Sequence, residues 1–232
     1  MHESGSIEST PVKEIVFVSW SGGKDSYLSL LRARETGLAV YCLLNFIDRS
    51  GYSRSHGLPA ALLQRQAAAL GIPLETEAVT WDTYETGFCA AINRLKEQGV
   101  TGGVFGDIDL QEHRDWIEKM CARCGIAFHL PLWGMEQRQV SEELLSRQGR
   151  AVLVSVRGDL LEESWLGRVL DEPFLDYCAK KGLSPCGERG EFHTLVVDGP
   201  LFREPLQYRS EAVERVERYA RLRLAAGSGS AE

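Results

Sequence analysis

The stretch that decides the fold runs from residue 15 to residue 31 and reads IVFVSWSGGKDSYLSLL. It begins with the apolar run Ile15 to Val18, turns at Gly22 and Gly23, and continues as the apolar-rich segment Tyr27 to Leu31. This order predicts a strand, a glycine turn and a helix. Glycines let the backbone approach a ligand, and the N–H groups and dipole at a helix start attract an anion. The sequence therefore predicts a phosphate-binding turn.

The hexapeptide at this turn, residues 21–26, differs from the Walker pattern, which has four residues between its first glycine and its Gly-Lys-Ser/Thr end. It resembles the PP-loop of ATP pyrophosphatases, in which an acceptor oxygen attacks the α-phosphorus of ATP and pyrophosphate leaves. The resemblance implies that the pyrophosphate is held by Ser21, Gly22, Gly23 and Ser26. It also implies that Lys24 neutralises charge and that Asp25 caps the helix or positions magnesium. The alternative is an ordinary glycine turn with an Asp/Ser helix cap.

Composition is that of a compact enzyme: 232 residues, of which 44% are apolar and 25% charged, enough for one or two domains. Twenty-six basic residues against thirty-three acidic ones give a net charge of -7. This balance argues against a broad surface that neutralises nucleic-acid phosphates, although a local basic patch can exist within an acidic total.

The amino-terminal residues 1–12 are polar, have no signal-peptide core and are expected to be flexible; no later run reaches membrane-spanning length. We therefore expect a cytoplasmic protein whose six cysteines are reduced thiols. Cys121 and Cys124 form a C-x-x-C pair, which raises a metal hypothesis. Because no second pair follows at zinc spacing and both fall in a predicted helix, burial as small apolar residues is favoured.

Beyond the turn, predicted strands and helices alternate. Strands are expected over residues 39–46, 74–79 and 100–105, and helices over residues 58–70, 83–98 and 111–124. Such alternation predicts an α/β fold with a parallel, doubly wound sheet, in which ligands bind at the carboxyl ends of the strands. The residues that directly follow each strand are therefore candidates for the site.

Two further groups of candidates follow predicted strands. Asp48, Ser53, Ser55 and His56 come after the second strand, and Gly106 and Asp107 after the fourth. Asp107 could coordinate magnesium or bond a ribose, the alternative being a helix cap. His56 could contact the adenine or the acceptor, the alternative being a solvated loop histidine.

The pattern changes from Ile126, where the rigid apolar segment Leu130 to Gly134 follows, and we place a domain boundary there, between residues 130 and 131. Helices are expected over 136–147 and 172–181 and strands over 151–156 and 193–197, which predicts a smaller α+β domain over residues 131–224. Residues 211–224 fit both helical spacing and strand alternation, so both readings stay open. Residues 225–232 are expected to be disordered.

A second informative block, PCGERGEFHT, covers residues 185–194. Glu188 and Glu191 could bind an amine and act as general bases, while His193 and Thr194 could orient a carboxylate acceptor. In the structural alternative, Gly187 and Gly190 form a turn and the charges face water.

These motifs in this order resemble the diphthine-ammonia ligase family, over about residues 14 to 202. The segments that carry the resemblance are residues 21–26, 105–108, 131–133, 166–168, 186–194 and 198–202. The resemblance implies an ATP-binding domain of the adenine nucleotide alpha-hydrolase (HUP) type over residues 13–130, followed by an acceptor-binding domain.

The resemblance also implies a reaction in which ATP adenylates the carboxylate of diphthine, a modified histidine of elongation factor 2, and ammonia displaces AMP. ATP and Mg²⁺ would be served by the PP-loop, Gly106 and Asp107, with Asp25 and Asp107 as the magnesium ligands. Acceptor and ammonia would be served by Ser55, His56, Gly187, Glu188, Gly190, Glu191, His193 and Thr194. Lys24, Asp25, Glu188, Glu191 and His193 would be catalytic.

One segment departs from the family pattern. Diphthamide-making relatives carry a Met-Tyr-His-Thr-like stretch after the second strand, where this chain has Ser-Arg-Ser-His-Gly over residues 53–57. The acceptor is thus a small-molecule or protein-borne carboxylate that need not be diphthine. Two other hypotheses remain open: a tRNA-thiolating PP-loop enzyme that uses the cysteines, and a module that senses ATP or AMP without cleaving it.

Overall fold

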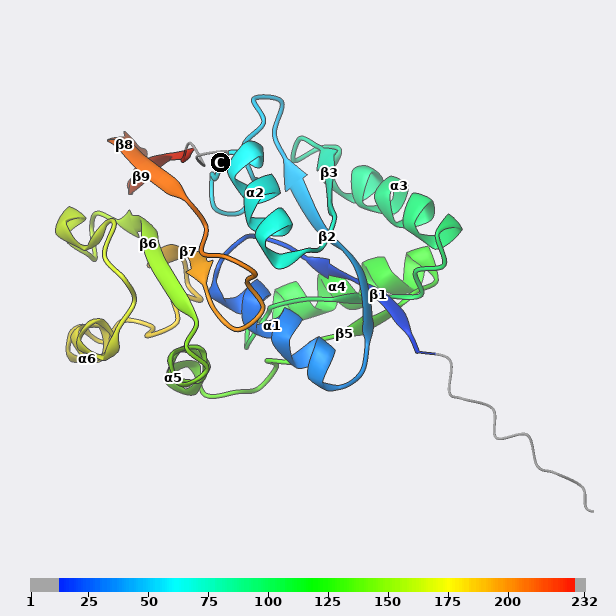
Figure 1. Ribbon diagram of the computed structural model, residues 1–232, viewed down its shortest axis with the longest axis horizontal. Helices are drawn as coiled ribbons and strands as arrows, with labels where there is room; N and C mark the ends of the chain where they lie inside the picture. The colour runs from blue at the N-terminus through cyan, green and yellow to red at the C-terminus, as the bar shows by residue number, and fades with distance from the viewer. Residues whose placement is uncertain (1–12, 228–232) are drawn as a thin grey trace, which may run out of the picture.

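The computed structural model describes residues 13–227. The flexibility expected for residues 1–12, and the disorder expected for residues 228–232, concern residues outside this range. A five-stranded parallel sheet has the order β3-β2-β1-β4-β5, and a four-stranded antiparallel sheet the order β7-β6-β9-β8 (Figure 1). The predicted α/β class, with a smaller α+β part after it, is confirmed.

The first sheet and its helices follow the predicted alternation. The elements are β1 (Ile15–Ser19), α1 (Lys24–Glu35), β2 (Ala39–Ile47), α2 (Ala60–Leu70), β3 (Leu74–Ala78), α3 (Tyr84–Glu97), β4 (Gly102–Val104), α4 (Gln111–Cys124) and β5 (Ala127–His129). Apolar residues of α1 and α2 share one core cluster and those of α3 and α4 another, so the sheet is covered on both faces. Strand β5 was not predicted, because its three residues are too short for a periodic signal.

The second sheet is built from the rest of the chain. Its elements are α5 (Gln137–Ser146), β6 (Arg150–Arg157), the 3₁₀ turn η1 (Glu163–Trp165), α6 (Glu172–Lys181), β7 (Phe192–Asp198), β8 (Tyr208–Val216) and β9 (Tyr219–Ala226). The open question about residues 211–224 is resolved in favour of strands. β8 and β9 form a hairpin whose two-residue loop places Glu217 at φ +53°. β9 runs to Ala226, two residues into the segment expected to be disordered.

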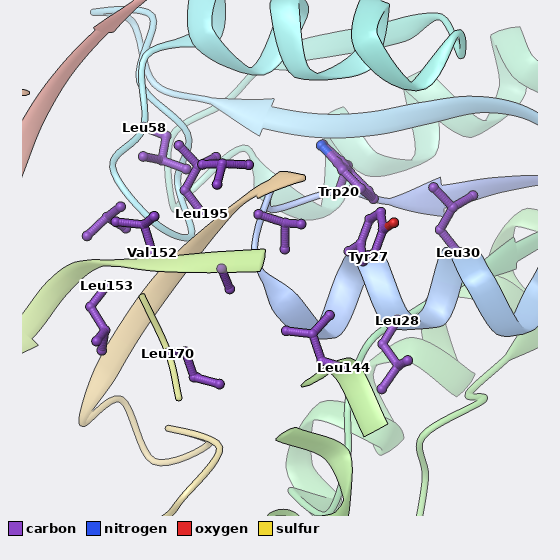
Figure 2. Close-up of a cluster of buried hydrophobic side chains, with 14 of the residues drawn as sticks. Trp20, Tyr27, Leu28, Leu30, Leu58, Leu144, Val152, Leu153, Leu170 and Leu195 are labelled. Carbon is purple, nitrogen blue, oxygen red and sulfur yellow. The ribbon is translucent and has the colours of Figure 1, made fainter. Parts of the chain in front are cut away.

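The core that joins the two sheets surrounds α1. Val152 and Leu153 of β6 and Leu195 of β7 belong to the same buried cluster as Trp20 and Leu28. Figure 2 shows these side chains around α1 and on both faces of β6. Cys121 and Cys124, in the last turn of α4, are buried in the other cluster, and burial raises the pKa of the Cys121 thiol to about 12. No helix within residues 13–227 combines the length and apolarity needed to cross a membrane.

One buried polar side chain, Gln66 of α2, connects the glycine turn to β7. Its Oε1 accepts from the indole Nε1 of Trp20 at 2.9 Å, and its Nε2 donates to the carbonyl oxygens of Gly22 at 2.9 Å and Val196 at 2.7 Å. The Gly22 carbonyl also accepts from the backbone N–H of Val196 at 2.9 Å. These bonds fix β7 against the turn.

We predict that Gln66→Leu lowers the free energy of unfolding by about 2–4 kcal/mol, because it leaves the Trp20 indole without its buried acceptor and two carbonyl oxygens short of a donor. Gln64→Leu, an exposed position on the same helix, should change it by no more than about 0.5 kcal/mol. Denaturant unfolding measures both. Equal stability of the two variants would show that Gln66 does not hold the strand to the turn.

Candidate active site

Side-chain and backbone contacts shape the glycine turn itself. The Ser21 hydroxyl accepts from the N–H of Gly23 at 3.2 Å and lies 3.2 Å from the Ser26 hydroxyl, which donates to the Gly23 carbonyl at 3.0 Å. Gly22 has φ +81°, and a Cβ on Gly23 would overlap the His56 ring. Both glycines are thus required by the protein's own packing. Gly23, the residue before α1, has no side-chain cap, so an ordinary Asp/Ser cap does not explain the turn.

Lys24 and Asp25 form an ion pair at the start of α1. Lys24, only 3% exposed, places Nζ 2.6 Å from Oδ1 and 2.8 Å from Oδ2 of Asp25. Burial opposes the Lys24 charge, yet the Asp25 carboxylate holds the Lys24 pKa above its ordinary value. Burial raises the pKa of Asp25, against the opposing effect of Lys24. The Lys24 backbone N–H donates to the Thr194 hydroxyl of β7 at 3.1 Å.

A cavity of about 720 Å³ opens over this turn, at the carboxyl ends of the parallel strands. Most of the candidates from the sequence line it: Ser21, Lys24, Asp25, Ser26, Ser55, His56, Gly106, Asp107, Gly187, Glu188, Gly190, His193 and Thr194. Two motifs that are more than 150 residues apart in the chain thus share one cavity. Gly22, Gly23 and Glu191 are not among the residues that line it.

Asp107 and Glu188 both line the cavity, and burial together with nearby charges, that of Asp107 among them, raises the pKa of Glu188. Asp107 does not cap α4; its Oδ1 lies 2.9 Å from Nδ1 of His113, and this hydrogen bond raises the pKa of His113. Burial, and next the charge of Asp25, raise the pKa of Glu188 to about 7. The N–H of Ile108 donates to Glu188 Oε1 at 3.3 Å and opposes this increase. Glu188 is therefore able to gain or lose a proton near neutral pH.

Two histidines, one from the segment between β2 and α2 and one from β7, pack together in the wall of the cavity. The rings of His56 and His193 have centroids 4.5 Å apart. Burial lowers the pKa of His193 to about 4, and burial followed by His193 lowers that of His56 well below its ordinary value. His56 Nδ1 lies 3.2 Å from the Thr194 carbonyl, an acceptor, so Nδ1 carries the hydrogen and Nε2 is left as an acceptor. Both imidazoles are neutral at physiological pH.

Glu191 lies behind the loop instead of in the cavity. It is 4% exposed, and its carboxylate accepts from the backbone N–H of Ser184 at 3.1 Å and of Arg189 at 3.1 Å. This position differs from the catalytic one expected from the sequence. These two hydrogen bonds join the Glu191 carboxylate to the backbone on either side of Glu188.

Several lining residues were missed by the sequence analysis: Asn45, Arg54, Trp81, Tyr84, His113, Cys186 and Tyr219. Asn45 offered a signal, since it is the one polar residue late in an otherwise apolar strand; its Nδ2 donates to the Trp20 carbonyl at 2.6 Å. Trp81 offered another signal, since it lies just after a predicted strand; in the structure its side chain is 74% exposed. An aromatic recess of about 570 Å³, lined by Trp81, Tyr84 and Trp116 among others, adjoins the cavity.

The acidic residues of the cavity fit a magnesium ion that arrives with a nucleotide. Mg²⁺ is commonly bound by one or two carboxylates together with substrate phosphates and water. Asp25 and Asp107 both line the cavity, and the Asp107 charge raises the pKa of Asp25, so the two carboxylates lie close enough to repel each other. Within residues 13–227 no group of three or more His, Cys, Asp or Glu has the arrangement of a metal site.

The parallel sheet, the glycine turn before α1 and the cavity at the strand ends define an α/β protein of HUP-like class. The family model described as the diphthamide synthase N-terminal domain matches residues 13–128, and that of the diphthamide synthase C-terminal domain matches residues 136–222. The chain belongs to the diphthamide synthase family, and the resemblance inferred from its motifs is confirmed. The domain limits placed at residue 130 and residue 224 stay predictions.

Curated relatives carry the name diphthine–ammonia ligase. The protein from Bos taurus is 26% identical over 212 residues, which cover 80% of this chain and 79% of the relative. That from Mus musculus is 27% identical with the same coverage, and that from Danio rerio 27% identical, covering 83% of the relative. Homologues of this family support an ATP-dependent ligase function.

The raised pKa of Glu188 predicts a pH-dependent effect of Glu188→Gln on stability. The pKa of Glu188 is about 7 in the folded protein and 4.5 for the free group, so the folded state favours the protonated, uncharged side chain. The fold therefore loses stability as pH rises from about 4.5 through 7 and this side chain becomes a carboxylate. Glu188→Gln should therefore raise the free energy of unfolding by about 1–2 kcal/mol near pH 8 and change it little near pH 4. Denaturant unfolding at both pH values measures the difference. A pH-independent effect would contradict the assigned pKa.

Proposed function

We propose that this protein is an ATP-dependent amide-forming ligase that adenylates an acceptor carboxylate and transfers ammonia to it, releasing AMP and pyrophosphate. The observation that supports this most strongly is the shared cavity: the PP-loop and the block at residues 185–194 line it together. A phosphate-binding turn alone would fit many nucleotide-dependent proteins. The second block adds titratable groups at the place where an acceptor would meet the α-phosphate.

In this proposal the β- and γ-phosphates of ATP lie on the turn of residues 21–26, with Lys24 Nζ as the buried cation. The backbone N–H groups at the start of α1 and the positive end of its dipole favour the phosphate charge. The adenine occupies the recess formed by Trp81, Tyr84 and Trp116, whose rings offer stacking faces. Asp25 and Asp107 would hold Mg²⁺, which when bound neutralises phosphate charge.

The reaction then has two steps. A carboxylate oxygen of the acceptor attacks the α-phosphorus, the bond from the α-phosphorus to the bridging oxygen breaks, and pyrophosphate leaves. Ammonia next attacks the acyl carbon, and AMP leaves with the electrons of the acyl–oxygen bond. The nitrogen must lose a proton, which the ionised fraction of Glu188 or the neutral Nε2 of His56 is able to accept, because Glu188 titrates near neutral pH and burial keeps the His56 pKa well below its ordinary value. Thr194 and His193 lie beside this point and would orient the acceptor.

The acceptor and the source of ammonia are part of the proposal. Diphthine is the acceptor that the relatives' name indicates, in which case the partner is elongation factor 2. The altered sequence at residues 53–57 lies in the cavity wall through Arg54, Ser55 and His56, which supports a different carboxylate acceptor. Free ammonium is the proposed nitrogen source. Nucleic acid and membranes are not proposed as partners. The cytoplasm is the proposed location, consistent with six free thiols.

The thiolation alternative needs a reactive sulfur in the cavity. Of the six cysteines, Cys186 lines it, and burial raises the pKa of this thiol to about 11. A thiol that is protonated at neutral pH is a poor nucleophile or sulfur carrier. This observation favours the ligase over the thiolating enzyme, and turnover of ATP separates the ligase from a sensing module.

We predict that protein incubated with α-labelled ATP, Mg²⁺, ammonium and a small-metabolite extract releases labelled AMP and unlabelled pyrophosphate. Lys24→Ala and Asp25→Ala should each lower the rate by about 10²-fold or more, because each removes a group placed at the phosphates. Lys180→Ala, an exposed lysine of α6, serves as the matched control and should leave the rate unchanged. Release of ADP, ATP left intact by the wild type, or wild-type turnover by Lys24→Ala would overturn the proposal.

A further inference from the structure

Two arginines beside the cavity have buried nitrogen atoms with no hydrogen-bond partner. These atoms are Nε and Nη2 of Arg54 and Nε of Arg221. Neither side chain forms an ion pair within residues 13–227. Buried polar groups are nearly always hydrogen-bonded, and leaving a charged donor unpaired is costly. The unpaired N–H groups of the two guanidiniums are therefore available to donate hydrogen bonds to an anion that is not part of the chain.

The two arginines come from different halves of the molecule and line one recess. Arg54 lies between β2 and α2, and Arg221 lies in β9. The guanidinium of Arg221 packs against Gly57. The recess has a volume of about 370 Å³ and is also lined by Tyr52, Trp81 and Leu222, among others. We call it the arginine recess. Arg54 lines both this recess and the 720 Å³ cavity, so the two are neighbours that share a wall.

The acidic side chains of the arginine recess are already engaged. Glu214 accepts from Arg223 Nη1 at 2.9 Å. Oδ1 of Asp48 accepts from the backbone N–H groups of Ser50 at 2.8 Å and Tyr52 at 3.0 Å. These contacts leave Arg54 and Arg221 as the cations of the recess without an internal partner.

Aromatic contacts fix the planes of the two guanidinium groups. Cζ of Arg54 lies 4.1 Å from the Trp81 ring centroid, and Cζ of Arg221 lies 5.6 Å from that of Tyr219. Stacking occupies the face of a guanidinium and leaves its N–H edge for an in-plane acceptor. A carboxylate or a phosphate matches that edge with two parallel hydrogen bonds, whereas a cation would be repelled.

We propose that the arginine recess binds a second acid group of the acceptor, so that the acceptor is a dianion or polyanion: one carboxylate reaches the α-phosphate of ATP while the other acid group rests on Arg54 and Arg221. This inference rests on the proposed function and names its substrate class. Arg221 lines the recess and not the nucleotide cavity, which assigns the anion to the acceptor and not to ATP.

The test is a binding experiment that needs no turnover. Calorimetric titrations are made on the full protein saturated with Mg²⁺ and α,β-methylene-ATP, which cannot release pyrophosphate. The probes are the dicarboxylates succinate, glutarate and adipate, the monoanion butyrate, and 4-trimethylammoniobutyrate, which replaces the second acid group by a cation. We expect at least one dicarboxylate to bind about tenfold or more tightly than both single carboxylates.

Arg221→Met should remove most of this preference and leave the affinity for the nucleotide analogue unchanged, because Arg221 does not line the nucleotide cavity; the retained affinity also shows that the variant is folded. Arg54→Met should remove most of the preference as well. Arg221→Lys, which keeps the charge but loses the planar fork, should retain only part of it. Arg215→Met is the matched control, because this arginine of β8 is exposed and pairs with Glu163 away from the recess.

Three results would overturn the inference: dicarboxylates that bind no more tightly than butyrate, no binding of any probe up to tens of millimolar, or arginine variants that lose the nucleotide analogue instead of the dicarboxylate. The outcome is separate from that of the ligase assay. A protein that prefers dicarboxylates but forms ADP would support the arginine recess as an anion site and contradict the proposed adenylation.

Discussion

The docking of β7 on the glycine turn is the contact on which the rest of the site depends. The N–H of Val196 donates to the Gly22 carbonyl at 2.9 Å, and two residues earlier the Thr194 hydroxyl accepts from the backbone N–H of Lys24 at 3.1 Å. Gln66 donates to both carbonyl oxygens of this junction, at Gly22 and Val196. One strand of the second sheet thereby forms part of the PP-loop's hydrogen-bond network.

This docking has a consequence for how the protein works. Because β7 also carries His193 and follows the loop with Glu188, any nucleotide held by the turn lies next to the residues proposed for acceptor and ammonia. The buried cluster shared by α1, β6 and β7 makes the two sheets one packed unit. The relative position of the two motifs is set by the core and does not depend on a flexible linker.

Electrostatics within the cavity are balanced in a way that suits incoming phosphates. Lys24 is neutralised by Asp25 in the absence of a ligand, while burial keeps His56 and His193 neutral and Glu188 near its midpoint at neutral pH. A triphosphate with magnesium would compete for Lys24 and place new charge beside Glu188. The cavity can thus take up a strongly charged ligand without burying further unpaired groups.

Local sequence chemistry was enough to predict the strand, turn and helix at residues 15–31 and the alternation that follows, because glycines, caps and apolar periodicity act over a few residues. Most of the site candidates that it named line the cavity, and the rule that strand ends carry the ligand site pointed to those that follow the strands of the parallel sheet.

What it could not predict depends on tertiary contacts. The orientation of Glu191 is decided by backbone N–H groups at Ser184 and Arg189, and the isolated sequence block does not show that it faces away from the cavity. Residues 211–224 satisfied two periodicities, and pairing with β6 selected the strand. Arg54 and Arg221 are 167 positions apart and meet only because β9 packs beside the β2–α2 segment.

The central claim, that the acceptor is adenylated before ammonia is added, is tested most directly by isotope exchange between labelled pyrophosphate and ATP. The protein is incubated with ATP, Mg²⁺, labelled pyrophosphate and the metabolite extract, with ammonium left out. The account predicts that label enters ATP only when the extract is present, because the first step is reversible and needs the acceptor but not ammonia. Absence of exchange in a preparation that forms AMP once ammonium is added would contradict an adenylate that precedes ammonia.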